Sequence, residues 1–326
     1  MDNIKVFYIS NFISQQIHVF KINSFGNIEL LQIVNTPGNG KPIVIHKTKR
    51  YLYLGIQSPP SIVTYTINDI GLLDQNNIIK TNYPTYLSIN SKLDLLYCIS
   101  YRESSMNIHP IYNGIVHKKI QKVENLTNCH SANIDKINNF IWIPCLNINE
   151  IRIYKINNLK FLPIKEHISI KIGKNFGPRH ITFNNNGKYA YVINELNGTI
   201  SVISTKTFNL IKTIKIYPKN IGILLSWSAE IHITNKNNFI YCTDRSTNSI
   251  SCFRVSELGD NISLINYYHT EYQPHGFDID KKSQFLIVAG QISNYISIYK
   301  INSKTGELLH LSRHKVGMKP MWVSFL

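Results

Sequence analysis

The amino-acid sequence predicts an all-β protein, a seven-bladed β-propeller with four antiparallel strands in each blade. Three observations support this fold class: an 18-residue pattern occurs seven times, its copies start 44 to 50 residues apart, and the two ends of the chain supply complementary parts of one blade. A regular repeat of this length is typical of propellers whose blades are four-stranded sheets. We therefore expect one domain over residues 1–326.

Each copy of the pattern has the character of a β-hairpin. A run of about six β-branched and aromatic residues is followed by a short polar loop and a second alternating run, as in "RYLYLGIQSPPSIVTYTI" from Arg50. Alternation with a period of two indicates strands with one face directed at a core. The copies start at Lys5, Arg50, Asp94, Asn139, Lys188, Asn238 and Gln284.

A further strand is expected on each side of every hairpin. The strand before the hairpin often opens with proline, as in "GPRHITF", and proline suits the first residue of a strand because no ladder hydrogen bond is lost there. The strand after the hairpin is weaker, as in Ile28 to Val34. The first hairpin has no strand before it, and Lys319 to Leu326 has no hairpin after it, so we expect these segments to pair and close the ring.

Charge and composition narrow the function classes. The formal net charge is +16, but no run of four basic residues occurs, so the charge predicts a solvated surface and no nucleic-acid partner. No apolar segment approaches the ~20 residues that span a bilayer and no secretory leader is visible, so we expect a cytoplasmic protein without a membrane partner. The five cysteines form no C-x-x-C pair, which predicts reduced, buried thiols and no metal site.

Chemistry is expected on the face of the ring where innermost strands begin and second strands end. When the innermost strands are aligned by their last apolar residue, their equivalent early positions hold Thr85, His130, Arg179, Ala229, His275 and Met321. Just beyond the second strands, Glu195 and Arg245 are the two charged residues among the seven blades. This register brings His130, Arg179, Glu195 and Arg245 onto one sector of one face.

These side chains suit acid–base chemistry on an anionic substrate, although each also has a structural interpretation. Two arginines can bind an anionic oxygen, a carboxylate can take a proton from water, and a histidine can shuttle one at neutral pH. Equally, Arg179 and Glu195 could form a structural ion pair, and His130 could bond a neighbouring loop. His275 could line the channel without touching a ligand. The tryptophans are expected to pack between blades, at Trp142, Trp227 and Trp322.

At these motifs the sequence resembles the family of seven-bladed-propeller lactonases over essentially the whole chain. The resemblance is carried by "SQQIHVF", "RYLYLG", "CHSANI", "GPRH", "YVINELN", "EIHIT", "DR" and "PMWV", at Ser14, Arg50, Cys129, Gly177, Tyr191, Glu230, Asp244 and Pro320. It implies hydrolysis of 6-phospho-D-glucono-1,5-lactone to 6-phospho-D-gluconate in the pentose phosphate pathway, with no cofactor or metal. The implied partner is a phosphorylated sugar lactone, and a monomer is expected.

The resemblance also implies roles for individual residues. Fungal relatives that cycloisomerise muconate place functional His, Arg and Glu on motifs that match His130, Arg179 and Glu195, and Arg245 matches a further arginine. Bacterial members usually read Q-P-R-G-F where this chain reads "QPHGF", so His275 stands in place of an arginine. The resemblance thus makes the residue at 275 a candidate substrate-binding group beside Arg179 and Arg245.

The expected mechanism is attack on the lactone carbonyl by a water that Glu195 deprotonates. Arg179 and Arg245 would stabilise the oxyanion or the phosphate, and His130 would protonate the leaving ring oxygen. Three functions compete: a lactone hydrolase, a cycloisomerase acting on a tricarboxylated muconate, and a non-catalytic scaffold that binds protein. Propeller architecture by itself does not choose among them.

Overall fold

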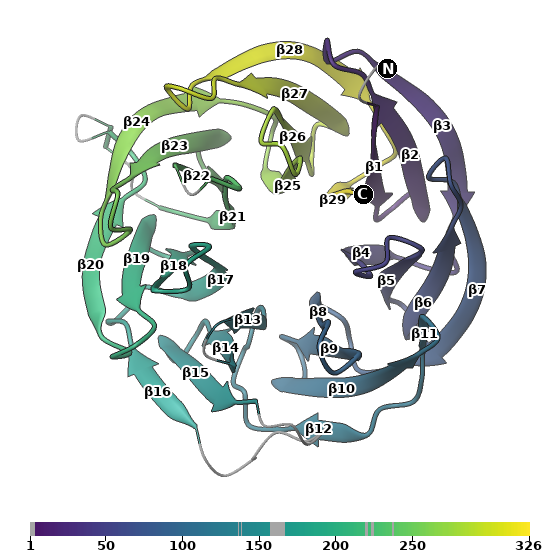
Figure 1. The fold of residues 1–326 in the computed structure, drawn as a ribbon, viewed down its shortest axis with the longest axis horizontal. Helices are drawn as coiled ribbons and strands as arrows, with labels where there is room; N and C mark the ends of the chain where they lie inside the picture. Colours follow the sequence, from purple (N-terminus) through teal and green to yellow (C-terminus); the bar gives the residue numbers. More distant parts are fainter. Residues whose placement is uncertain are drawn as a thin grey trace.

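The computed structural model describes residues 4–135, 137, 139–156, 167–218, 221–222, 225–236 and 238–326. Over these ranges the strands form seven antiparallel sheets arranged as blades around a central channel (Figure 1). No helix that could span a membrane occurs in these ranges. The predicted seven-bladed propeller is confirmed.

Within each blade, the strands are described in order from the centre of the ring outward. The innermost strands are β4 (Gly40–Ile45), β8 (Tyr86–Asn90), β13 (Asn133–Asp135), β17 (Pro178–Phe183), β21 (Ser228–Ile233), β25 (Pro274–Ile279) and β29 (Pro320–Phe325). The second strands are β1 (Lys5–Asn11), β5 (Tyr51–Gln57), β9 (Leu95–Ser100), β14 (Phe140–Cys145), β18 (Tyr189–Asn194), β22 (Phe239–Asp244) and β26 (Phe285–Gly290).

The outer two positions of the blades follow the same order. The third strands are β2 (Gln16–Ile22), β6 (Pro60–Ile67), β10 (Ser105–Tyr112), β15 (Glu150–Lys155), β19 (Thr199–Ser204), β23 (Ser249–Val255) and β27 (Tyr295–Ile301). The outer strands are β3 (Ile28–Asn35), β7 (Leu73–Lys80), β16 (Ile168–Lys171), β20 (Leu210–Lys215), β24 (Ile262–His269) and β28 (Leu308–Lys315).

The third sheet departs from the predicted four strands. Its outer edge consists of two short strands, β11 (Ile115–Val116) and β12 (Gln121–Val123), which both pair with β10. The break between them lies opposite His109 and Pro110, and proline has no N–H to donate to a neighbouring strand.

Ring closure occurs as the sequence predicted. Strand β29 pairs with β1 in antiparallel register, with Phe325 opposite Phe7 and Val323 opposite Ile9. The sheet order is β29-β1-β2-β3, so the two ends of the chain lie in one blade (Figure 1). The pairing satisfies the inner edge of β1, which would otherwise be an open template for another strand.

The core lies between neighbouring blades. Trp142 is fully buried and packs with Ile181 and Ala190 of the next sheet, so the predicted packing role of this tryptophan is confirmed. All five cysteines are unpaired and buried, as expected. The apolar faces that the period of two predicted are therefore covered on both sides.

Irregular register at the start of the innermost strands shapes the channel. Pairing shifts between Gly40 and Ile43, between Pro178 and His180, and likewise at the starts of β21 and β25. A β-bulge of this kind breaks the strict alternation of a strand and re-aims side chains. As a result the consecutive residues Arg179 and His180 are both buried.

Candidate functional site

The centre of the site is a carboxylate held between two arginines. Glu195 follows β18, and its Oε2 lies 2.8 Å from Arg179 Nε and 3.1 Å from Arg245 Nη2. Arg179 is completely buried and Arg245 is 6% exposed, so neither guanidinium is free to swing into solvent. The three predicted residues therefore come together as the register indicated.

Main-chain oxygens fix both guanidinium groups. Arg245 donates from Nε to the carbonyl of Trp227 (3.1 Å) and from Nη2 to that of Ser228 (3.2 Å). Arg179 donates from Nη1 to the carbonyl of Ala229. Both arginines thus form hydrogen bonds with the main chain at the start of β21, and these bonds hold the guanidinium groups in place.

Trp227 belongs to the site, and its predicted packing role between blades is wrong. It is 38% exposed, its ring lies 3.9 Å from the Arg245 guanidinium carbon, and its Nε1 donates to Glu195 Oε1 at 3.0 Å. Its backbone N–H donates to Asp244 Oδ2, which anchors the loop in front of β21. A tryptophan whose N–H meets a carboxylate and whose face covers a cation orients both groups.

His275 lies beside Arg179 at the start of β25. Its Nδ1 is 3.2 Å from the Met321 carbonyl, and its Nε2 is 3.5 Å from Arg179 Nη2. Burial, followed by the neighbouring charges of Lys41 and Arg179, holds the pKa of His275 well below its usual range. A neutral ring that donates to a carbonyl and accepts from Arg179 supports that arginine rather than supplying a second cation.

His130 takes part in a buried chain of hydrogen bonds. Its Nδ1 lies 3.1 Å from His180 Nε2, and His180 Nδ1 lies 2.7 Å from Glu230 Oε1. The ring also contacts Tyr101 with centroids 5.7 Å apart. His180 and Glu230 were missed from the sequence because they follow Arg179 and Ala229 directly. In a regular strand such neighbours point to opposite faces, and the bulges remove that alternation.

Lys41 is a further cation at the site that the sequence reasoning overlooked. It sits in β4 four residues before Ile45, the register position that His130 and Arg179 occupy in their own blades, so the same alignment could have found it. The side chain is 9% exposed, and its ammonium has no ion-pair partner among the described residues. Burial, together with Arg179 and Arg245, lowers the pKa of Lys41 to about 7.

The site is therefore a buried cluster of three basic side chains with Glu195 at its centre and a second buried carboxylate, Glu230, near Arg179 and Lys41. Arg179, Arg245 and Lys41 outnumber these two carboxylates, and burial strengthens the resulting field because less water screens it. Such a site can bind an anionic group and stabilise an oxyanion. Among the described residues, no group of three or more His, Cys, Asp and Glu side chains is arranged to hold a metal ion.

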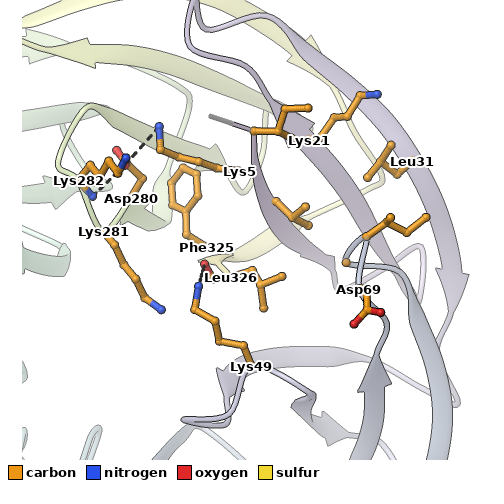
Figure 2. A pocket seen from close by; sticks show the side chains of 14 residues that line it. Lys5, Lys21, Leu31, Lys49, Asp69, Asp280, Lys281, Lys282, Phe325 and Leu326 are labelled. Atoms are coloured by element: carbon orange, nitrogen blue, oxygen red, sulfur yellow. Dashed lines mark hydrogen bonds and ion pairs between the residues drawn. The ribbon is translucent and has the colours of Figure 1, made fainter. Parts of the chain in front are cut away.

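A separate basic pocket lies at the opposite end of the strands. It measures about 690 Å³, and Lys49, Lys281 and Lys282 reach it from turns that follow the innermost strands (Figure 2). Among its lining residues, Lys5 Nζ lies 3.6 Å from Asp280 Oδ2. The pocket shares no lining residue with the arginine cluster.

Comparison with known proteins places this chain in one family. The chain belongs to the family described as "Lactonase, 7-bladed beta-propeller", which matches residues 6–325. It is 44% identical to a 6-phosphogluconolactonase of Blochmanniella pennsylvanica, over 99% of this chain and 98% of that protein. It is 39% identical to a 6-phosphogluconolactonase of Sodalis glossinidius, over 99% of each.

A solved structure supports the fold independently. The periplasmic gluconolactonase of Pseudomonas aeruginosa superposes with a TM-score of 0.89 at 18% identity, covering 99% of both chains. Similarity at this level of identity concerns the propeller architecture and not the side chains in its channel.

Proposed function

We propose that this chain hydrolyses 6-phospho-D-glucono-1,5-lactone to 6-phospho-D-gluconate, acting as a cytoplasmic monomer in the pentose phosphate pathway. The observation that carries the proposal is the buried cationic cluster, in which three basic side chains stand against two carboxylates, Glu195 and Glu230. A substrate with a phosphate and a reactive ester carbonyl carries negative charge, and it develops more on the carbonyl oxygen during hydrolysis, which these basic side chains can bind. The relatives named 6-phosphogluconolactonase, similar over nearly the whole chain, support the same substrate.

The cluster offers a place for each charged part of the reaction. Water attacks the lactone carbonyl, negative charge develops on the carbonyl oxygen, and the bond to the ring oxygen then breaks. Arg179 and Arg245 can stabilise the oxyanion because their heads are already fixed before substrate arrives. Of the three basic side chains in the cluster, Lys41 has no ion-pair partner among the described residues, so it is suited to the phosphate.

The contacts favour an exchange of the two proton-transfer roles assigned from sequence. Glu195 Oε2 lies between two guanidinium groups and its Oε1 accepts from Trp227, so it is better placed to hold the arginines than to take up a proton. His130 is neutral, because burial and then Arg179 hold its pKa well below the usual range. We propose His130 as the base that deprotonates water and then returns the proton to the ring oxygen.

A coupled assay tests this function. The lactone is generated freshly from glucose 6-phosphate, and formation of 6-phosphogluconate is followed with its dehydrogenase and corrected for spontaneous hydrolysis. We expect turnover well above background that falls when the cluster is altered. A rate equal to spontaneous hydrolysis would contradict the proposal and favour the scaffold interpretation.

A further inference from the structure

We infer that His180 and Glu230 are positioning residues that hold His130 as its Nδ1–H tautomer and so keep its Nε2 unprotonated. The inference deepens the proposed function, on which it rests, by assigning roles to two residues whose described hydrogen bonds and ion pairs do not involve the arginine pair. It follows from the geometry of the hydrogen-bond chain described above.

The three groups form one continuous chain across neighbouring blades. His130 precedes β13, His180 lies in β17 and Glu230 in β21, and their exposed fractions are 9%, 2% and 5%. The two links measure 3.1 Å and 2.7 Å between heavy atoms. Both are within ordinary hydrogen-bond range, so each must contain one proton.

The direction of the chain is set at its carboxylate end. Burial raises the pKa of Glu230, but the nearby His232 and Arg179 and the backbone N–H of Ile231, which donates to Oε1 at 3.2 Å, favour the ionised, accepting form. His180 must then donate from Nδ1, and a neutral imidazole with a proton on Nδ1 has a bare Nε2. That bare nitrogen can only accept, so His130 donates from Nδ1 and its own Nε2 carries a lone pair.

The surroundings keep both imidazoles neutral in the resting site. Burial, followed by the positive charge of Arg179, holds the pKa of His130 and of His180 well below the usual range. The remaining nitrogen of His130, Nε2, has no hydrogen-bond partner among the described residues, and His130 is the most exposed member of the chain. His130 Nε2 is therefore the free end of the hydrogen-bond chain.

This arrangement supplies what a base beside two arginines requires. When water gives a proton to His130 Nε2, the hydroxide adds to the lactone carbonyl, and the new imidazolium is stabilised through His180 by Glu230. When the ring C–O bond breaks, the same proton passes from Nε2 to the leaving oxygen and the ring becomes neutral again. A histidine oriented by an acidic partner through its second nitrogen is a recurring way to fix a tautomer.

The tautomer is measured directly by long-range 1H–15N correlation spectra of protein labelled with 15N-histidine. The His130→Asn variant identifies the His130 signals among the 12 histidines. We expect Nδ1 of His130 to have the shift of a protonated nitrogen and Nε2 that of a bare one. A protonated Nε2 in the unaltered protein would overturn the inference, whether or not the protein hydrolyses the lactone.

Kinetics of a matched pair of variants test the consequence. His180→Phe removes the acceptor for His130 but keeps an aromatic ring against Tyr86 (5.1 Å between centroids). His232→Phe is the control, because His232 Nε2 also faces Glu230 Oε1, at 3.7 Å, but does not contact His130. We expect His180→Phe to lower kcat at least tenfold with KM within twofold, and the control to change neither by more than twofold.

The outcomes separate this inference from the proposed function. A folded His180→Phe protein with normal kcat would make the chain purely structural and would leave the lactonase proposal intact. Background turnover by the unaltered protein would overturn the proposed function, whereas the spectra would still decide the tautomer. If His180→Phe does not fold, the spectra of the unaltered protein alone decide the inference.

Discussion

Two basic regions lie at opposite ends of the strands, but they are built differently. At one end, Arg179 and Arg245 are buried, fixed by carbonyl oxygens and centred on Glu195. At the other end, Lys49, Lys281 and Lys282 of the 690 Å³ pocket extend from turns on long side chains (Figure 2). Burial and the nearby Lys49 lower the pKa of Lys281 to about 8.

This difference makes the buried arginines better suited than the surface lysines to the proposed catalysis. A flexible ammonium on a turn attracts anions, but it must lose conformational freedom to hold one in a single orientation. A guanidinium that the backbone has already oriented does not have to lose this conformational freedom when an anion binds. An innermost strand of six residues spans about 20 Å, more than the Debye length of about 8 Å at physiological salt, so the two ends act separately.

The largest expected effect concerns His130, the proposed base at the arginine end. Replacing it by asparagine removes the group that takes the proton from water, so kcat should fall by about 10² to 10⁴ while KM stays within twofold. Steady-state kinetics with freshly generated lactone measure both constants, and thermal melting controls for folding. Normal turnover would exclude His130 as the base.

The next effect distinguishes the two roles considered for Glu195. Glu195→Gln keeps the shape but leaves Arg179 and Arg245 facing each other without an anion between them, so kcat/KM should fall on the order of a hundredfold, with both constants affected. If kcat alone falls and KM is unchanged, Glu195 is the base, as the sequence predicted. The same coupled assay provides both values.

A smaller effect is expected at Lys41, where the charge depends on pH. Lys41→Met should weaken competitive inhibition by 6-phosphogluconate on the order of tenfold at pH 7. Because the pKa of Lys41 is lowered to about 7, its ammonium loses its proton as pH rises from 7 to 8.5, and affinity should decline over that interval in the unaltered protein. The phosphate is already dianionic there, its second pKa being about 6.

The Lys41→Met protein itself is the control for that measurement. Its inhibition constant should be nearly independent of pH between 7 and 8.5, since the titrating ammonium is absent. Parallel pH profiles for the two proteins would mean that Lys41 does not contact the phosphate.

The smallest effect is expected at the opposite end of the strands. The double variant Lys281→Gln and Lys282→Gln should leave kcat and KM within twofold at 0.15 M salt, because these lysines only add to a screened surface potential. A fivefold rise in KM at that salt concentration would show that the two ends are not independent.

The sequence predicted the fold well because the relevant signals are periodic. Alternation of apolar residues every two positions identifies hairpins wherever they occur, and seven similar hairpins specify a closed ring. The split blade was visible in the unmatched strand at each end. The divided outer strand of the third sheet was missed because β11 and β12 are too short to show a period.

The site was only partly predictable, for reasons that are local. Register placed His130, Arg179, Glu195 and Arg245 on one sector, and the resemblance added His275, which lies 3.5 Å from Arg179. The bulges hid His180 and Glu230, because a one-residue irregularity changes which side chains face the channel and leaves no mark in composition. Trp227 immediately precedes β21, so the alternation of residues within strands could not predict where its side chain lies.

The pairing of β29 with β1 also affects how the chain can be made. More than 300 residues separate Phe7 from its partner Phe325. At a synthesis rate of about 5 to 20 residues per second, β1 waits on the order of 15 to 60 s on the ribosome with its inner edge unpaired. Six blades can form as they emerge, but the ring closes only after synthesis has passed residue 325, so closure is the last step in the assembly of this propeller.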